Sequence, residues 1–364
     1  MLQTLKDEAF LIVALLVAVL AYVFETSLVD SGQVMALVAT TVLVLTIVLA
    51  SVRVAHHAEV LAEKVGDPYG TMILTLSAVL VEVVILGILM SHEPSPTLVR
   101  DTIYAAVMLD LNGILGLAAL MGGFRHGEQP YNDDSARTYS VMILTAMSVS
   151  MVVPEFIPHA KWHLYSAFTI GAMLLLYGVF LRMQVGAHSY FFSYNYPEKK
   201  RRRKTQPEAE HKPGSRGLSI AMLCVGVVLI GALAEVMSQS LSVGLKGTGA
   251  PPILAALLVA AISASPEILT ALRAALANRM QSVVNIALGA SLSTVILTVP
   301  VMEAMALYSG QPFEMAMTPV QTLMVFITLI VAAINLNDGE TNAIEGMTHF
   351  VLFATFIMLS LIGL

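Results

Sequence analysis

The chain has 364 residues, of which 57% are hydrophobic and only 12% are charged, and its mean hydropathy is +0.80. Because a soluble domain is about 45–50% apolar, this composition predicts an integral membrane protein. The single cysteine, Cys224, lies in an apolar segment, which excludes a disulfide framework and a cysteine-based zinc site. The net charge of −6 indicates no particular partner.

Eleven apolar runs are long enough to cross a bilayer at about 20 residues per crossing. The predicted spans are residues 8–26, 33–53, 70–91, 99–121, 138–158, 164–185, 217–240, 250–276, 282–306, 316–336 and 343–363. The first run has no convincing cleavage site after it and is predicted to be a retained span. The fold class is therefore an all-α integral membrane protein. The run 250–276 is expected to form one span or two half-helices that meet at Pro266.

A basic, proline-containing stretch, NYPEKKRRRKTQPEAEHKPGSR, separates the sixth run from the seventh. Eight of the 19 Lys and Arg residues fall between Lys199 and Arg216. Because such segments stay on the cytoplasmic side of a membrane, the stretch predicts a cytoplasmic N-terminus and an external C-terminus. A topology determinant near anionic lipid is favoured over a nucleic-acid or regulator site.

The two sides of this linker carry similar features in the same order. We predict an N-terminal helix at residues 1–30, a first five-helix repeat at 31–190, a basic cytoplasmic linker at 191–216 and a second five-helix repeat at 217–364. Each repeat has one glutamate in an apolar run near its beginning, Glu82 and Glu267, which are 185 positions apart (267 minus 82). A repeat with an odd number of spans inserts upside down the second time. The two carboxylates are therefore expected to face each other at mid-depth.

Two facing carboxylates inside a membrane are suited to binding protons or a cation. Two carboxylates in a low-dielectric cavity repel each other when both are ionised, so they hold protons unless a cation replaces them. Calcium takes about six to eight oxygen ligands. The residues that offer further oxygens near the two glutamates are Ser77, Asn112, Ser263, Ser265 and Ser293, with Gly289 and Asn285 one and two turns before Ser293. Each serine is equally well interpreted as a packing residue.

Pro266 stands directly before Glu267 and cannot donate a hydrogen bond to the carbonyl of Ile262. Irregular backbone at membrane depth is tolerated where it lines a cavity or is buried in protein. We therefore expect the carbonyls just before Glu267 to be free to point at an ion.

Two further acids and a histidine pair lie in or beside the spans. Asp110, on a different side of its helix from Asn112, is either an auxiliary proton carrier or a structural partner. Glu235 either lines the proton path or reaches water. For His56 and His57, a solvated cytoplasmic helix extension is favoured over a metal site or a pH sensor.

Two stretches carry a family resemblance. They are SPEILTALRAALANRMQSVVNIALGASLSTVILTVP in the second half, and GDPYGTMILTLSAVLVEV followed by RDTIYAAVMLDLNGILGLAALMGG in the first. With one extra helix and two inverted five-helix repeats, the chain resembles the calcium/proton antiporters of the cation/calcium exchanger superfamily, most closely the bacterial ChaA-type branch. The resemblance covers nearly the whole chain.

The resemblance implies that Glu82 and Glu267 bind the cation and exchange it for protons. Ala78-Val79 and Ser263-Ala264 stand where the wider superfamily usually has a Gly-Asn pair. The ChaA-type branch is associated with sodium and potassium as well as with calcium.

The sequence predicts a secondary transporter of a bacterial inner membrane that exchanges cytoplasmic Ca²⁺ for external protons by alternating access. A Na⁺/H⁺ or K⁺/H⁺ antiporter that uses the same site is the alternative. A cation channel is a remote alternative. An intramembrane enzyme is a remote alternative too, because Asp133 and Asp134 lack the spacing of a metal motif. The expected partners are inorganic cations, protons and the lipid bilayer, with no cofactor and no nucleic acid.

Overall fold

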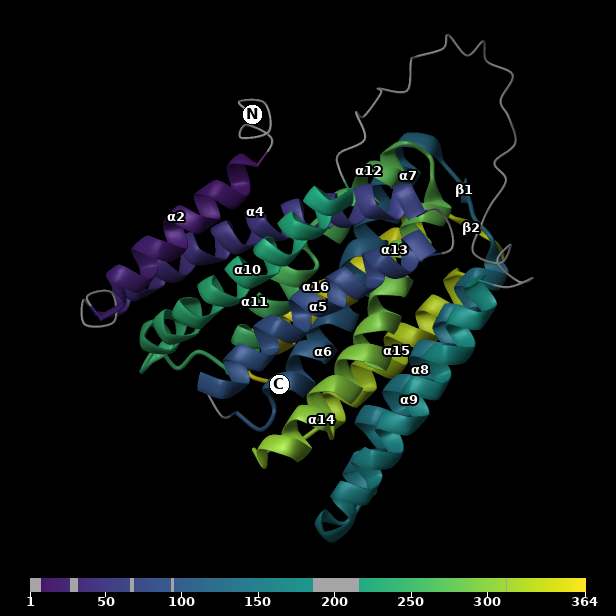
Figure 1. Cartoon of the computed structure of the whole chain (residues 1–364). Helices are drawn as coiled ribbons and strands as arrows, with labels where there is room; N and C mark the ends of the chain where they lie inside the picture. The colour runs from purple at the N-terminus through teal and green to yellow at the C-terminus, as the bar shows by residue number, and fades with distance from the viewer. Residues whose placement is uncertain (1–7, 27–31, 66–68, 93–94, 186–215, 312) are drawn as a thin grey trace.

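The computed structural model describes residues 8–26, 32–65, 69–92, 95–185, 216–311 and 313–364, and these are almost entirely helical (Figure 1). The helices of the first half are α2 (Ala9–Val23), α4 (Gln33–Val65), α5 (Tyr69–His92), α6 (Leu98–Met108), α7 (Leu115–His126), α8 (Asp133–Met147) and α9 (Trp162–Val185). Those of the second half are α10 (Arg216–Leu245), α11 (Ile253–Ser263), α12 (Ser265–Leu276), α13 (Met280–Ser293), α14 (Val299–Ser309), α15 (Pro319–Asn335) and α16 (Ala343–Leu361). The predicted linker lies outside the described residues except for Arg216, which begins α10.

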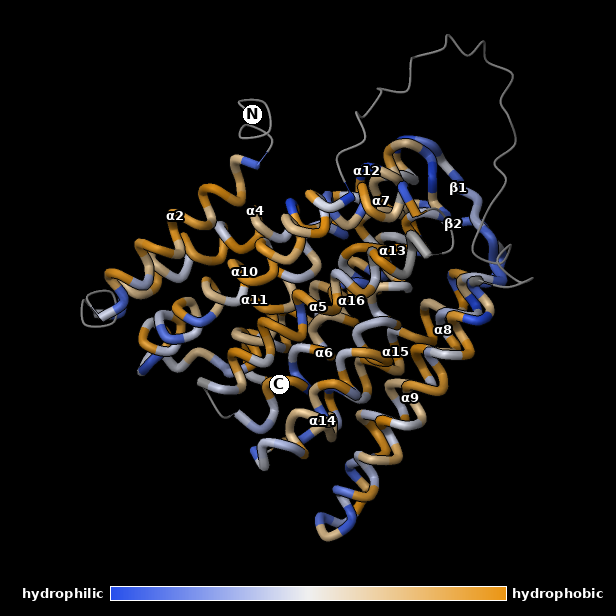
Figure 2. Tube along the Cα trace, viewed as in Figure 1, coloured by the Kyte–Doolittle hydropathy of each residue, from blue (hydrophilic) through white to orange (hydrophobic). Residues whose placement is uncertain are grey.

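The helices have the length and composition of membrane spans. Among the described residues, seven helices are long and apolar enough to cross a membrane, and α11 with α12 makes an eighth if the bent pair is one span. Shorter apolar helices cover Ala9–Val23, Thr75–Ser91 and Pro319–Asn335. Figure 2 shows hydrophobic residues along the outer helices and hydrophilic residues gathered at helix ends and around the strands. The prediction of a helical, multi-span membrane protein is confirmed at this level.

Two long, interrupted helices form the centre of the bundle. The π-helical segment η1 (Leu109–Ile114) joins α6 to α7, and the π-helical segment η6 (Thr294–Thr298) joins α13 to α14. Within their most apolar windows, 89% and 72% of these two helices are buried, against 17% of α9 and 22% of α16. A π-helical turn holds an extra residue and is frequent at functional sites. The central position of both interruptions marks the region where a site is expected.

The apolar run that contains Pro266 consists of two half-helices, as one of the two predicted alternatives has it. Helices α11 and α12 meet at Ala264 with a bend of 55°. Pro266 is the second residue of α12, where a missing backbone N–H costs nothing. The carbonyl of Ile262 is not free, because the Ser265 hydroxyl donates to it at 2.8 Å. The expectation that this carbonyl points at an ion is therefore wrong.

Helix α4 continues twelve residues beyond the predicted end of its span, and the extension packs against the start of α2. The Arg53 guanidinium donates two hydrogen bonds to the Glu8 carboxylate, at 2.8 and 2.6 Å. The Nε2 atom of His57 lies 3.1 Å from the same carboxylate, and this histidine is only 4% exposed. The prediction of a solvated extension is therefore wrong for His57, because the N-terminal helix covers it.

A two-stranded antiparallel ladder joins two helix connections at one end of the bundle. Strand β1 (Gln129–Pro130) follows α7 and pairs with strand β2 (Glu340–Thr341), which precedes α16. The buried Gln129 side chain donates to the carbonyl of Ala275 near the end of α12. Two-residue strands leave no alternating pattern in a sequence, so nothing in the sequence predicts this tie between the two halves.

Helices α7 and α16 approach each other so closely that only glycine fits. A Cβ atom on Gly346 would lie 2.2 Å from the backbone nitrogen of Leu120 and 2.8 Å from the carbonyl oxygen of Gly116. Small residues allow membrane helices to make this kind of backbone contact. The contact fixes α16 against the central helix that contains η1.

Gly346→Ala is expected to lower the thermal unfolding temperature of the protein in detergent by at least about 4 °C, since backbone atoms cannot move aside for a methyl group. Gly171→Ala on α9 is the matched control, because a Cβ there meets no atom within 4 Å. In a helix, alanine is itself about 1 kcal/mol more favourable than glycine. Equal unfolding temperatures for the two variants would contradict the close approach.

Candidate functional site

A cavity of about 820 Å³ lies between the two halves of the chain. Its walls come from α4, α5, α6, η1, α8, α9, α11, α12, α13 and η6. It reaches Glu59 near the end of α4, Gln184 near the end of α9 and Ser282 near the start of α13. In the other direction it ends at the level of Glu82 and Ile296. The cavity therefore extends from the middle of the bundle to one of its two ends.

Glu82 of α5 is 3% exposed and lies at the inner end of the cavity. Its Oε2 atom accepts hydrogen bonds from the hydroxyls of Thr294 at 3.1 Å and Thr298 at 2.8 Å. Both threonines belong to η6, so the first half of the chain provides the acid and the second half provides its donors. Its Oε1 atom is buried and has no hydrogen-bond partner among the residues that the structure describes. One lone-pair-bearing oxygen is thus available to a proton or a cation.

Glu267 lies in the first turn of α12, directly after the break. The unpaired backbone N–H groups and the dipole at a helix N-terminus favour a negative charge there. Its Oε2 atom is buried without a hydrogen-bond partner in the described part of the chain, and the residue lines the same cavity as Glu82. The break thus places a carboxylate with a vacant oxygen at membrane depth.

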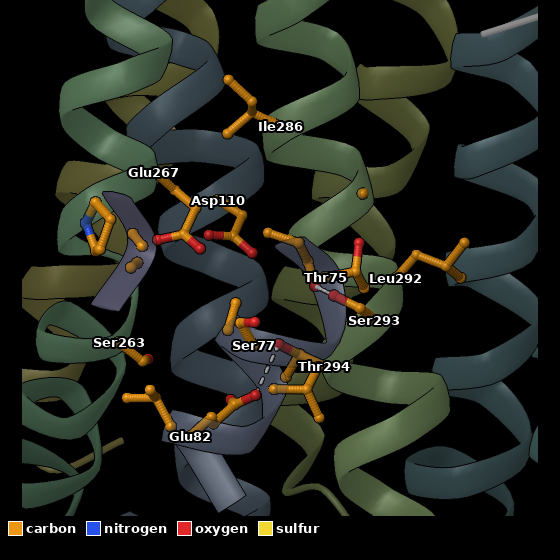
Figure 3. Close-up of a pocket in the computed structure, with 18 of the residues that line it drawn as sticks. Thr75, Ser77, Glu82, Asp110, Ser263, Glu267, Ile286, Leu292, Ser293 and Thr294 are labelled. Atoms are coloured by element: carbon orange, nitrogen blue, oxygen red, sulfur yellow. Dashed lines mark hydrogen bonds between the residues drawn. The ribbon is translucent and has the colours of Figure 1, made fainter. Parts of the chain in front are cut away.

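Asp110 adds a third carboxylate to the cavity. It lies in η1, is 2% exposed, and accepts a hydrogen bond from the Ser291 hydroxyl at 3.1 Å. Its charge interacts with Glu267 and, less strongly, with Glu82. Figure 3 shows the carboxyl groups of Glu267 and Asp110 next to each other, with Glu82 farther along the cavity beside Thr294. The two halves of the chain therefore meet at the acids in η1 and α12.

Hydroxyl groups line the cavity between these acids. Ser77, Ser263 and Ser293 are in the wall, as are Asn285 and Gly289. Each of the three serine hydroxyls donates to a backbone carbonyl of its own helix. Since the proton of each hydroxyl is already committed, its oxygen lone pairs are what it offers to a bound cation.

Three predicted site residues lie away from the cavity wall. The Asn112 amide donates to the Thr328 hydroxyl at 2.8 Å and accepts from His349 at 3.0 Å, which connects η1 to α15 and α16. The Ser265 hydroxyl donates to the carbonyl of Ile262 at the break between α11 and α12. The Glu235 carboxylate accepts a hydrogen bond from the Tyr22 hydroxyl, which joins α10 to α2.

The sequence interpretation missed two residues of the interrupted helix α13–η6–α14. Thr298 donates the shorter of the two hydrogen bonds to Glu82, and its spacing of four from Thr294 was the available signal. Glu303 of α14 is an acid that is only 2% exposed, and its position within the predicted span 282–306 was the available signal. An acid inside an apolar run is a functional candidate by default.

The acids are arranged along the cavity rather than gathered at one point. Within the described residues, no group of three or more His, Cys, Asp and Glu side chains is positioned to hold a metal ion together. A cation in this conformation would be held by no more than two carboxylates together with hydroxyl, amide or water oxygens. Such a loosely built set suits a transported ion, which must leave as readily as it enters.

A bundle of apolar helices around a buried acidic cavity that reaches one end defines a class of protein, the ion transporters. The sodium/calcium exchanger protein family matches residues 35–186 and 218–362 of the chain. The chain belongs to this family, whose members transport ions and need no cofactor. It is a transporter and not an enzyme.

Two relatives agree with this assignment, and a solved structure shares the fold. The chain is 30% identical over 362 residues to the sodium-potassium/proton antiporter ChaA of Escherichia coli, covering 98% of this chain and 97% of the relative. It is 32% identical over 314 residues to the putative ionic transporter y4hA of Sinorhizobium fredii, covering 84% of each. The fold is similar to that of the Ca²⁺/H⁺ antiporter YfkE, with a TM-score of 0.73, 17% identity and coverage of 97% of this chain and 99% of that structure.

Proposed function

We propose that the protein is a cation/proton antiporter that expels cytoplasmic Ca²⁺ in exchange for external protons, with Glu82 and Glu267 as the exchanging groups. The observation that carries the proposal is that buried acids from both halves of the chain line one cavity and keep oxygens that have no hydrogen-bond partner within the described segments. A site with such oxygens binds either protons or a cation, and the binding of one displaces the other.

We also propose that the chain is one N-terminal helix followed by two inverted five-helix repeats, giving eleven spans. The support is a shared offset. The π-helical segments η1 and η6 begin 185 residues apart (294 minus 109), and Glu82 and Glu267 are separated by the same interval (267 minus 82). Two independent features with one offset are expected if both halves derive from one unit.

The conformation is that of an inward-facing transporter in this proposal. The cavity reaches the ends of α4 and α9 and the start of α13. Helix α9 ends just before the basic linker in the sequence, and Arg216, the last residue of the linker, donates to the carbonyl of Lys64 at the end of α4. Because basic linkers stay on the cytoplasmic side, the open end faces the cytoplasm, with the N-terminus inside and the C-terminus outside. A bacterial inner membrane is the proposed location.

The transport cycle follows from charge. In the inward-facing state the higher cytoplasmic pH removes protons from Glu82 and Glu267, and the emptied carboxylates capture a cation. In the outward-facing state external protons displace it. A cavity with unneutralised carboxylates resists closing, since burying an unpaired charge is expensive. Each proton that moves down 100 mV releases about 2.3 kcal/mol for extrusion.

A monovalent cation is the alternative cargo, and the relatives support keeping it open. The E. coli relative is a sodium-potassium/proton antiporter, whereas the fold is shared with a Ca²⁺/H⁺ antiporter. A monovalent ion would use the same cavity with one more carboxyl protonated.

The test is a comparison of salts in everted membrane vesicles that hold an acidic interior. Adding Ca²⁺ is expected to release protons from the vesicles at micromolar to low millimolar concentration, and Na⁺ or K⁺ is expected to release fewer. Vesicles without the protein are the control. Release by Na⁺ or K⁺ alone would replace calcium with the monovalent cargo, and no release by any of the three salts would reject the antiporter.

A further inference from the structure

The interrupted helix α13–η6–α14 carries one buried acid that the proposed transport site does not use. Glu303 of α14 is 2% exposed, and its Oε2 atom has no hydrogen-bond partner among the described residues. A carboxyl group inside a membrane protein is costly to keep, and such groups mark ion or proton pathways. The group therefore needs an explanation other than packing.

Glu303 lies on the sealed side of the cavity. The helix α13–η6–α14 lines the cavity from Ser282 to Ile296, and Glu303 comes seven residues later. At about 1.5 Å of rise per residue, it lies about 10 Å beyond the cavity and about 9 Å before the helix end at Ser309. It thus occupies the layer between the transport site and the opposite surface of the bundle.

The neighbours of Glu303 do not neutralise it. Helix α14 packs against α9, α5 and α6. From α9, the Tyr165 hydroxyl donates to the carbonyl of Val149 at 2.6 Å. From α6, Arg100 is paired with Asp101 at 2.9 Å. Within the described residues no salt bridge to Glu303 is formed, so the group is suited to carry a proton rather than to hold a fixed charge.

One helix connects Glu303 to the transport site. The hydroxyl of Thr298, five residues before Glu303, donates to Glu82 at 2.8 Å. The geometry points to Glu303 as the outer proton-relay group, which takes up an external proton and passes it toward Glu82. The proton leaves the Glu303 carboxyl as the Glu82 carboxylate gains one, and Glu303 is then reprotonated from outside. This inference rests on the proposed exchange of cations for protons.

If Glu303 is a proton relay, its loss should slow proton-driven transport without slowing the movement of the cation itself. Two assays on reconstituted protein measure these two processes separately. The first is Ca²⁺ transport driven by a proton gradient. The second is exchange of labelled for unlabelled Ca²⁺ across the membrane at equal pH, which needs alternating access but no net proton transfer. Glu303→Gln is expected to slow the first at least about tenfold and to leave the second within about twofold of the unaltered protein.

Two variants accompany it. Glu303→Asp keeps a titratable group and is expected to recover part of the proton-driven rate. Glu155→Gln replaces an exposed acid of the segment Val153–Phe156 and is expected to change neither assay.

Each outcome decides the matter. Unchanged proton-driven transport in Glu303→Gln would overturn the relay, and so would an equal loss in both assays, which would indicate a structural role. If the unaltered protein exchanges Ca²⁺ for Ca²⁺ but never for protons, the proposed antiport fails and the relay with it. If it exchanges protons and only the Glu303 comparison fails, the antiport stands.

Discussion

Glu267→Gln is expected to abolish cation-dependent proton release from everted vesicles. Glutamine has nearly the same size and keeps an oxygen in the cavity, but it neither binds nor releases a proton and carries no charge for a cation. Glu267 is also the acid that the break at Ala264 places at the start of α12. The rate is expected to fall at least about 100-fold, since general loss of an essential proton-transfer group has effects of this size.

The measurement is the recovery of acridine-dye fluorescence when salt is added to the vesicles. The amount of protein purified from the membranes shows whether the variant is inserted normally. Glu340→Gln, which alters an exposed acid in β2 at the end of the bundle, is the matched control and should behave like the unaltered protein. Retained exchange in Glu267→Gln at normal protein levels would reject the assignment of Glu267.

Asp110→Asn is expected to weaken the binding of calcium more than the binding of monovalent cations. The Asp110 and Glu267 carboxyls lie next to each other in the cavity (Figure 3). A divalent cation gains from two adjacent charges, and calcium affinity follows the number of charged ligands, so the half-saturating Ca²⁺ concentration should rise at least about tenfold. A monovalent ion needs one carboxylate and should be affected much less.

The control for Asp110 is Ser291→Ala, which removes the 3.1 Å hydrogen bond and keeps the carboxylate. It is expected to change Ca²⁺ saturation only a few-fold. Ca²⁺ and Na⁺ saturation curves, measured on the same reconstituted samples, give the ratio of effects. Equal weakening of both ions by Asp110→Asn would mean that the residue supports the cavity without selecting its ion.

Some features of the site depend on local sequence alone and were predictable. An acid inside a run of apolar residues is expected at membrane depth, which made Glu82, Glu267 and Asp110 candidates for the site. A proline in the middle of such a run interrupts the helix, which identified the break before Glu267. Both conclusions need no knowledge of which helices are neighbours.

Other features depend on how helices face one another. Thr298 reaches Glu82 across 216 positions, and Asn112 bonds to Thr328 across the same separation instead of lining the cavity. His57 is buried because a helix from the N-terminus covers it. A pattern of apolar runs contains no information on these contacts, since a bilayer accepts many arrangements of the same spans.

The sequence by itself determined that this is a helical membrane protein with charged groups held at membrane depth, because the cost of placing polar atoms in lipid acts on each segment separately. Only the tertiary structure decided which acids and hydroxyls share a cavity and to which end it opens. The physical reason is that side-chain direction depends on helix rotation, which the extra residues of η1 and η6 and the bend at Ala264 change locally.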